Sequence, residues 1–206
     1  MIAHHDSTPV LIACAIGGYL LGSIPFGLIV TRQAGVGDIR GIGSGNIGAT
    51  NVLRTGRRDL ALLTLLGDGG KGAVAVLLAA LISPVAAAAA GTAAFLGHLF
   101  PVWLHFKGGK GVATFFGVMI AAAWPAGLAA GATWIIVAAI FRFSSLASLA
   151  AAALAPVFVG LLHGWGTPPF WLALAMAVLV FVRHGENIER LIEGKETKIG
   201  AAKKAP

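Results

Sequence analysis

Apolar residues occur along the chain in long, nearly unbroken blocks rather than in alternation with polar ones. The runs 9–30, 60–82 and 85–103 approach or exceed the about 20 residues that an α-helix needs to cross a bilayer. A membrane β-barrel would show alternation instead. Because backbone that faces lipid must satisfy its own hydrogen bonds, we predict an all-α integral membrane protein.

Seven transmembrane helices account for these blocks, and several of them are short. A helix over 112–124 reaches only about 20 Å, against a hydrocarbon core of ~30 Å. The alternative is a five-helix path that fuses 112–141 around a kink at Pro125 and also fuses 146–183. We favour the path with helices at 9–30, 60–82, 85–103, 112–124, 126–141, 146–162 and 169–183.

Composition and charge placement suggest how the helices are oriented. Of the 206 residues, 57% are hydrophobic and 11% are charged, whereas a soluble domain carries about 25% charged residues. Apart from Lys71, every Lys and Arg lies in one of four polar segments. Since basic residues mark cytoplasmic segments, we expect an outside N-terminus, a cytoplasmic C-terminus and one membrane-embedded domain, 1–206. Its cytoplasmic segments are then 32–58, 104–111, 142–148 and 183–206.

This topology also explains the formal net charge of +7. The remaining positive charge suits anionic lipid headgroups or an anionic substrate, and we do not expect nucleic-acid binding. The single cysteine, Cys14, lies in the first apolar run, so no disulfide framework is predicted.

The first polar segment contains the glycine-rich stretch "GSGNIGATNVLR", residues 43–54. It fits G-x-G-x-x-G but lacks the preceding strand that a dinucleotide site requires. Successive small residues nevertheless expose backbone N–H groups before a helix, and such groups bind anions. The alternative is an ordinary flexible loop. The candidate phosphate-binding residues are Ser44, Asn46, Thr50, Asn51 and Arg54.

A second glycine-rich basic stretch, residues 97–114, ends in "FKGGKGVAT". Lys107 and Lys110 stand before a helix that is expected from Val112. Lysines at a cytoplasmic helix end are often only topology markers, and the motif lacks the Ser or Thr of a P-loop. Two basic, glycine-flanked sites on one side suggest two phosphate groups, or one phosphate and a developing oxyanion.

The apolar runs contain few polar side chains. Asp68 and Lys71 lie three residues apart on one helical face, either as functional groups or as a structural ion pair. We interpret His98 as a hydrogen-bonded packing residue. Because no Cys, His or carboxylate cluster has the spacing of a metal site, no metal is predicted.

The last two polar segments supply candidates for proton transfer. His184 and Asn187 follow the seventh helix, and His commonly transfers protons near neutral pH. The segment "RFSSLAS" adds Arg142, Ser145 and Ser148. A serine nucleophile is disfavoured because the chain lacks a G-x-S-x-G elbow.

Six stretches occur together in one order and resemble the bacterial acyl-phosphate:glycerol-3-phosphate acyltransferase family of integral membrane enzymes. The resemblance spans nearly the whole chain. The stretches are "GSIPFG" (22–27), "GSGNIGATNVLR" (43–54), "DGGKG" (68–72), "GHLFPVWLHFKGGKGVAT" (97–114), "SLAS" (145–148) and "RHGENIERLIEGKE" (183–196).

The resemblance implies transfer of a fatty acyl group from acyl phosphate to the 1-hydroxyl of glycerol 3-phosphate, which yields lysophosphatidic acid and phosphate and opens phospholipid synthesis. It implies seven helices in the bacterial inner membrane, a cytoplasmic site, no cofactor and no acyl carrier protein. The oligomeric state stays open. By motif, the site would be lined by Ser44, Arg54, Lys110, Ser148, His184 and Asn187.

These expectations leave two questions open. The hydroxyl proton has two candidate acceptors, His184 and a phosphate oxygen of the donor. The alternative from another functional class is a membrane transporter or channel for phosphate-bearing solutes. It would use the same cations, but the outer connections carry no basic residue and no internal repeat is evident.

Overall fold

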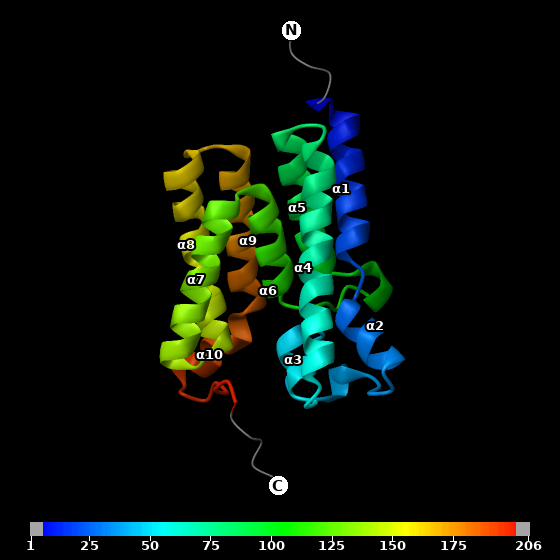
Figure 1. Ribbon diagram of the computed structural model, residues 1–206, viewed down its shortest axis with the longest axis vertical. Helices are drawn as coiled ribbons and strands as arrows, with labels where there is room; N and C mark the ends of the chain where they lie inside the picture. The colour runs from blue at the N-terminus through cyan, green and yellow to red at the C-terminus, as the bar shows by residue number, and fades with distance from the viewer. Residues whose placement is uncertain (1–5, 201–206) are drawn as a thin grey trace.

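The computed structural model describes residues 6–200, and over this range the chain is helical without β-strands. Figure 1 shows long helices standing side by side, with short helices gathered at the lower end. The long helices are α1 (Thr8–Gly22), α4 (Arg58–Ala80), α5 (Pro84–Leu99), α6 (Val112–Ala122), α7 (Trp124–Phe141), α8 (Ser144–His163) and α9 (Pro168–Arg183).

The short helices lie in the polar connections and at the end of the first apolar run. They are α2 (Phe26–Gln33), η2 (Ile39–Gly41), α3 (Ala49–Leu53), η3 (Val102–Leu104) and α10 (Gly185–Ile192). The amphipathic helix α10 follows α9 after a 60° bend at His184. The connections therefore carry local structure that positions their polar side chains.

Within residues 6–200 all seven predicted apolar helices are present, but two of them are interrupted: the predicted helix 85–103 ends as α5 at Leu99 and is followed by the separate short helix η3. The run 9–30, which we predicted as one helix, is divided at residues 23–25 into α1 and α2, where Pro25 removes a backbone donor. Among the described residues, five helical stretches are long and apolar enough to span a membrane, and the bent α9–α10 pair makes a sixth; α6 is shorter. The helical membrane architecture is thus confirmed.

The five-helix alternative is wrong within the described chain. The backbone leaves the helical conformation at Ala123 (φ −155°), so α6 and α7 form a hairpin and not one kinked helix. A Cβ atom on Gly127 of α7 would lie 2.8 Å from the backbone nitrogen of Ile120 in α6. Helices α8 and α9 are likewise separate, and a turn at Gly164 (φ +96°) joins them at the top of Figure 1.

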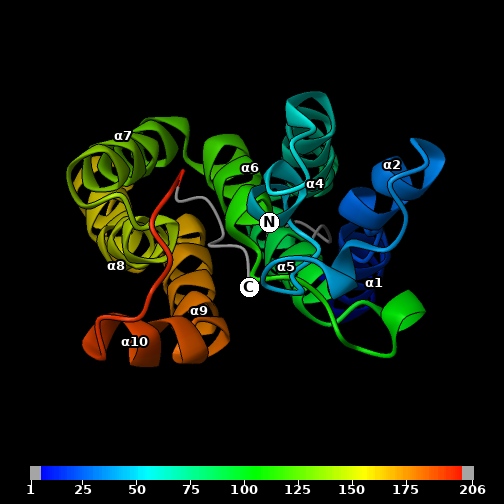
Figure 2. The same cartoon turned by 90° about the horizontal axis from the view of Figure 1, so that it is seen from below.

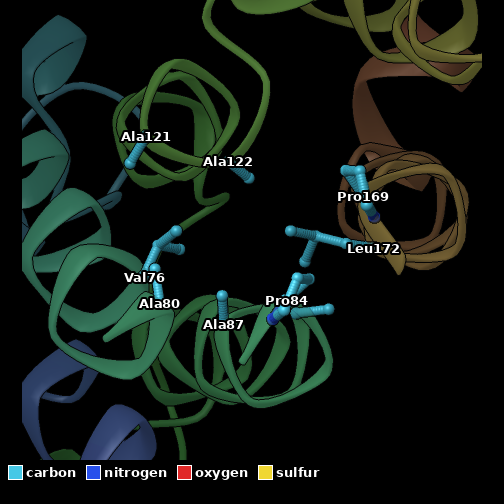
Figure 3. A pocket seen from close by; sticks show the side chains of 9 residues that line it. Val76, Ala80, Pro84, Ala87, Ala121, Ala122, Pro169 and Leu172 are labelled. Carbon is cyan, nitrogen blue, oxygen red and sulfur yellow. The ribbon is translucent and has the colours of Figure 1, made fainter. Parts of the chain in front are cut away.

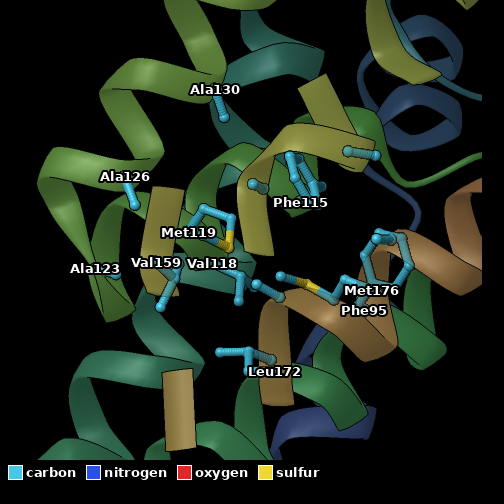
Figure 4. Packing of buried hydrophobic residues seen from close by; sticks show 14 of the residues in the cluster. Phe95, Phe115, Val118, Met119, Ala123, Ala126, Ala130, Val159, Leu172 and Met176 are labelled. Carbon is cyan, nitrogen blue, oxygen red and sulfur yellow. The ribbon is translucent and has the colours of Figure 1, made fainter. Parts of the chain in front are cut away.

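Close helix contacts depend on small residues, as is common in membranes. A Cβ atom on Gly22 of α1 would lie 2.0 Å from the Ala94 carbonyl oxygen of α5, and one on Gly117 of α6 would lie 1.9 Å from the Gly69 carbonyl oxygen of α4. Larger apolar side chains fill the centre between α5, α6, α8 and α9 (Figure 4), among them Phe95, Phe115, Met119, Leu172 and Met176. This packing fixes the helix ends that carry the polar segments.

An apolar cavity of about 220 Å³ opens between α4, α5, α6 and α9 (Figure 3). It lies where α4 ends and α5 begins, at the upper end of Figure 1. No ionisable side chain lines it; its walls are Val76, Ala80, Pro84, Ala87, Ala88, Ala121, Ala122, Pro169 and Leu172. The candidate chemistry lies at the opposite end.

Candidate active site

The polar segments gather at one end of the helix bundle. The connection from α2 to α4, the start of α8 and helix α10 all lie at the lower end in Figure 1, and Figure 2 shows this end face-on. The loop from η3 to α6 lies in the same lower half. Of the last predicted segment, 183–206, residues 201–206 lie outside the described range.

Three of the predicted site residues meet around Glu196. Lys110 Nζ donates a hydrogen bond to Asn187 Oδ1. Asn187 Nδ2 and Ser145 Oγ both donate to Glu196 Oε1, over 2.6 and 2.7 Å, and Arg190 Nε donates to Oε2 over 2.8 Å. Burial raises the pKa of Glu196, but the hydrogen bonds from Ser145, Arg190 and Asn187 outweigh burial and hold it below its usual value. The carboxylate is therefore ionised and orders its three neighbours.

His184 lies at the turn between α9 and α10 and is 3% exposed. Its Nδ1 is 2.8 Å from the Val180 carbonyl oxygen. Because a carbonyl only accepts, Nδ1 must carry the proton, which leaves a lone pair on Nε2. Burial lowers the pKa of His184 to about 4, and the positive charge of Lys110 acts in the same direction. At neutral pH the ring is therefore an uncharged hydrogen-bond acceptor.

Lys110 itself is half-buried in the loop before α6. Burial lowers its pKa, as does the positive charge of Arg190, whereas Glu186 and Glu196 raise it. Lys107, three residues earlier, has an exposed side chain without a hydrogen bond to any described residue. The structure thus separates the two candidate lysines of this loop, and only Lys110 joins the cluster around Glu196.

The hydroxyl group of Ser148 is occupied. It donates to the Ser144 carbonyl oxygen over 2.8 Å and accepts from Trp134 Nε1 over 3.0 Å. This arrangement holds α7 against α8 and leaves no activating base for a serine nucleophile. Arg142 is also engaged elsewhere, since its Nη2 donates to the Ile199 carbonyl oxygen over 3.1 Å. Neither side chain makes a hydrogen bond to the cluster around Glu196.

The glycine-rich loop is ordered by Asn51, which is buried. Asn51 Oδ1 accepts from the Ser44 backbone nitrogen over 3.0 Å and from Ser44 Oγ over 3.3 Å, while its Nδ2 donates to the Ile39 carbonyl oxygen over 2.9 Å. Asn46 Oδ1 accepts from the Gly48 backbone nitrogen over 3.3 Å. Asn51 and Asn46 are therefore structural residues of the loop, in addition to being candidate ligands.

Arg54 follows this ordered loop at the end of α3, and its side chain lies against Gly43. Arg54 is exposed and has no ion pair or side-chain hydrogen bond with any residue from 6 to 200; the same range offers no side-chain partner to Thr50. No hydrogen bond within the described chain joins this loop to Lys110 or His184. Among the basic residues of this end face, Arg54 and Lys110 are thus two candidate phosphate ligands that no hydrogen bond within residues 6–200 connects.

Asp68 and Lys71 form a buried ion pair in α4. Lys71 Nζ donates to Asp68 Oδ1 over 2.8 Å and to the Ile24 carbonyl oxygen over 2.7 Å, and both side chains are 1% exposed. Our interpretation of His98 as a hydrogen-bonded packing residue is wrong in its first part: Nδ1 lies 3.5 Å from Asp68 Oδ1 without a hydrogen bond, while the buried ring packs against Gly109. The group holds the break between α1 and α2 against α4 and α5. Within residues 6–200, no three His, Cys, Asp or Glu side chains are arranged to hold a metal ion.

Comparison with known proteins decides the family. The model of the family described as glycerol-3-phosphate acyltransferase matches residues 12–194 of this chain. The chain belongs to this family. This glycerol-3-phosphate acyltransferase acts in phospholipid synthesis, as the family description implies, and the match favours the enzyme over the transporter.

Relatives of this acyltransferase are similar over almost their full length. A glycerol-3-phosphate acyltransferase of Caulobacter vibrioides is 65% identical over 193 residues, covering 92% of this chain and 88% of its own. One from Rhodospirillum rubrum is 56% identical over 206 residues, covering 95% and 94%. A crystal structure of PlsY (YgiH), an integral membrane glycerol 3-phosphate acyltransferase in its glycerol 3-phosphate form, has a TM-score of 0.87 at 37% identity, covering 92% and 96%. Its lysophosphatidic acid form has a TM-score of 0.86 at 36% identity.

Glu196 and Arg183 are among the residues of the candidate site that were not assigned from the sequence. Glu196 connects Ser145, Asn187 and Arg190, and Arg183 donates to backbone carbonyls in the loop that carries Lys110. Both stand in the stretch 183–196, where we interpreted the basic residues as topology signals. The stretch carries four glutamates, so nothing in the sequence singles out Glu196; for Arg183 the sequence offers no signal beyond its position next to His184.

Proposed function

We propose that this acyltransferase moves a fatty acyl group from acyl phosphate to the 1-hydroxyl of glycerol 3-phosphate, releasing lysophosphatidic acid and inorganic phosphate. The observation that carries the proposal is the presence of two candidate phosphate ligands, Arg54 and Lys110, in the polar segments at one end of the bundle, with His184 close enough to Lys110 for that charge to lower its pKa. Both substrates bear a phosphate, and two separate cations suit two phosphates.

Arg54 is the candidate for one phosphate. Its guanidinium is free among the described residues, and its side chain lies against Gly43. The Ser44, Gly45 and Gly48 backbone nitrogens of the loop already donate within the loop and to Asn51, so the guanidinium is the group offered to a phosphate here. An arginine fork is suited to phosphate oxygens. Ser44, Asn46, Thr50 and Asn51 remain candidate neutral ligands of the same group, and Lys107 and Arg142 candidate outer cations.

Lys110 is the candidate for the other phosphate. Asn187 accepts a hydrogen bond from its ammonium group and is itself held by Glu196, and the positive charge of Lys110 acts on nearby His184. A cation fixed in a partly buried site stabilises negative charge that develops on a departing phosphate more strongly than it would in water. Ser145 would support the cluster from the start of α8 through its hydrogen bond to Glu196, whereas the Ser148 hydroxyl is bonded to Ser144 and Trp134.

In the proposed reaction the hydroxyl oxygen of glycerol 3-phosphate attacks the acyl carbonyl carbon. The bond between that carbon and the phosphate oxygen breaks, and the hydroxyl proton ends on the released phosphate. Neutral His184 would accept a hydrogen bond from the attacking hydroxyl through Nε2 and orient it. With a pKa of about 4, the ring is a weak base, which favours a phosphate oxygen as the final proton acceptor. The acyl phosphate is already activated, so alignment supplies much of the acceleration.

The acyl chain needs an apolar surface next to this chemistry. Phe181 and Val182 at the end of α9 are 40% and 67% exposed, and they directly precede Arg183 and His184. A fatty chain lying along such lipid-facing side chains would leave its phosphate at the aqueous edge. We expect the site to face the cytoplasm of the bacterial inner membrane, in line with the basic segments around it.

The donor is tested with purified protein in lipid nanodiscs, labelled glycerol 3-phosphate and a choice of acyl phosphate, acyl-CoA or acyl carrier protein. We expect labelled lysophosphatidic acid and one equivalent of phosphate with acyl phosphate alone. Product formed only with a thioester donor would contradict the proposed donor while leaving the family activity intact.

Sidedness is tested separately with single cysteines in a Cys14→Ala background. Thr50→Cys at the candidate site and His163→Cys at the opposite end form a matched pair. In right-side-out inner-membrane vesicles, an impermeant maleimide should label position 163 and spare position 50. Labelling of position 50 from outside would reverse the proposed orientation.

A further inference from the structure

Arg183, the last residue of α9, reaches across to the loop that carries Lys110. Its Nη2 donates to the Gly108 carbonyl oxygen over 3.1 Å and to the Gly109 carbonyl oxygen over 3.2 Å, and its Nε lies 3.3 Å from the latter. The guanidinium carbon is 5.4 Å from the centre of the Phe100 ring, at cation–π distance. Three hydrogen bonds from two guanidinium nitrogens, together with one aromatic ring, thus fix the guanidinium on the residues that precede Lys110.

The opposite side of this loop is fixed by α5. The Gly108 and Gly109 backbone nitrogens donate to the carbonyl oxygens of Leu99 and His98, over 3.2 and 3.1 Å. A Cβ atom on Gly109 would lie 2.3 Å from His98 Nε2, so the turn has no room for a side chain there. The loop is therefore clamped between the end of α5 and the guanidinium of Arg183, and Lys110 follows at the next position.

An ordinary explanation of Arg183 is that it marks the cytoplasmic end of a membrane helix. That explanation requires only a positive charge, which lysine supplies equally well. The observed contacts require more, because a planar guanidinium presents several N–H donors in one fork whereas an ammonium acts as a point charge. Two neighbouring carbonyl oxygens and an aromatic face are targets that lysine cannot satisfy together.

We infer that Arg183 is a positioning residue that sets where Lys110 stands relative to His184 and Asn187. The inference rests on the phosphate-binding function proposed for Lys110. Arg183 belongs to the helix end next to His184, while the carbonyls that it binds belong to the turn next to Lys110. The clamp therefore ties the candidate cation and the candidate acceptor into one unit.

The decisive variant is Arg183→Lys, which keeps the charge but loses the fork. We expect a loss of about 100-fold in kcat/KM, the scale of an ångström-sized misplacement of a reacting group, with an unchanged thermal unfolding midpoint. The changes in kcat and in the two KM values should follow those of Lys110→Ala. Arg32→Lys is the matched control, because Arg32 is an exposed arginine with a single 3.3 Å ion pair to Asp38, and it should retain parental activity.

Hydrogen–deuterium exchange of the same proteins reports on the loop without relying on turnover. Arg183→Lys should speed amide exchange in peptides that cover 105–111, while peptides from α4 and α8 stay unchanged. Parental activity and parental exchange in Arg183→Lys would overturn the inference, as would faster exchange throughout the bundle. Lys110→Ala separates the two proposals: if that variant is fully active, the proposed function of Lys110 fails, whereas an inactive Lys110→Ala beside a fully active Arg183→Lys refutes only the clamp.

Discussion

Lys110 donates a hydrogen bond to the side-chain oxygen of Asn187, which stands 77 residues later in the chain. The amide nitrogen of the same Asn187 donates to Glu196 Oε1 over 2.6 Å. The amide group is therefore oriented by a cation on its oxygen side and by a carboxylate on its nitrogen side. Only an amide can serve both neighbours at once, because a carboxylate has no donor for Glu196.

Asn187→Asp tests this orientation with a change of nearly equal size. The new carboxylate would pair with Lys110 and repel Glu196, so that Lys110 is neutralised by the protein itself. We expect kcat/KM for glycerol 3-phosphate acylation to fall about 100-fold. Glu189→Gln, an exposed change on the same helix, is the control and should leave the rate unchanged. An active Asn187→Asp enzyme would show that the contact is incidental.

Glu196→Gln should lower the stability of the folded protein as well as its acyltransferase activity. The carboxylate accepts from Ser145, Asn187 and Arg190, whereas a glutamine has one acceptor oxygen and must turn an NH₂ group toward a donor. We expect the free energy of unfolding to fall by about 1–3 kcal/mol, the range for hydrogen bonds to charged groups and for unsatisfied buried ones. Thermal unfolding in detergent measures the change.

Glu193→Gln is the matched control for Glu196→Gln. Glu193 is 44% exposed in its side chain and pairs with exposed Lys195 over 3.0 Å. Surface ion pairs of this kind contribute about 0–1 kcal/mol. Equal destabilisation by the two substitutions would contradict a special function of Glu196 in the cluster.

The sequence predicts the helices of this protein better than it predicts their contacts. The apolar blocks are long enough to dictate helix, and basic residues mark the connections, so that all seven apolar segments and the common end of the polar segments follow from pattern alone. The break at 23–25 was missed because Ile24, Pro25 and Phe26 continue the apolar run. A proline inside such a run is tolerated in membrane helices, so its presence alone does not locate a break.

For the candidate site, the sequence likewise suggests individual residues but not the long-range contacts that support them. Residue type together with the glycine-rich motifs nominates His184, Lys110 and Arg54 as candidates. Their supports are long-range contacts: Arg183 bonds to carbonyls 74 and 75 residues away, and Glu196 to a serine 51 residues away. No local pattern encodes such pairs. In the same way, the hydroxyl of Ser148 looks available in the sequence, but Trp134 and Ser144 occupy it.

The ring of His184 should stay neutral well below the ordinary range of histidine. Its folded-state pKa is about 4, whereas an exposed histidine titrates near 6.5. As pH falls from about 6.5 to about 4, the unfolded chain takes up this proton before the folded protein does, so this group lowers stability over that window. Below about 4 its contribution is constant.

NMR of ¹⁵N-histidine-labelled protein measures this pKa directly. The ring signal that disappears in His184→Asn assigns the residue. We expect that signal to keep the shift of a neutral ring with Nδ1 protonated at pH 5.5. A midpoint near 6.5 would contradict the burial of His184 and would restore it as a conventional base.

Gly43→Ala should disturb the loop that holds Arg54. Gly43 has φ +58°, and an alanine Cβ there would lie 2.4 Å from Asn51 Oδ1 and 2.8 Å from Arg54 Cδ. A left-handed non-glycine residue costs about 1–2 kcal/mol, and both neighbours must also move. We expect at least a tenfold loss of kcat/KM, with normal insertion into membranes.

Gly41→Ala in the same loop is the matched control. Nothing lies within 4 Å of a Cβ at Gly41, and its φ is not positive. This variant should keep parental kinetics. If Gly43→Ala and Gly41→Ala behave alike, the close approach of Arg54 and Asn51 to Gly43 has no part in activity.

Substitutions of Asp68 and Lys71 can show whether this buried ion pair has a structural function only or also acts in the reaction. The Lys71 ammonium group donates hydrogen bonds to Asp68 and to the Ile24 carbonyl oxygen. These contacts suit an ion pair that holds α4 against the break between α1 and α2. Asp68→Asn leaves Lys71 as an uncompensated charge in the membrane and should destabilise the protein by about 3–5 kcal/mol.

Asp68→Leu combined with Lys71→Met removes both charges while keeping apolar volume, and replacement of a buried ion pair in this way is often neutral. We therefore expect the double variant to recover the membrane yield and the unfolding midpoint that Asp68→Asn loses, and to keep measurable acyltransferase activity. Activity is the informative readout. A double variant that is as stable as the parent but catalytically dead would show that the pair acts in the reaction, since the packing of α1, α2 and α4 would then be intact without it.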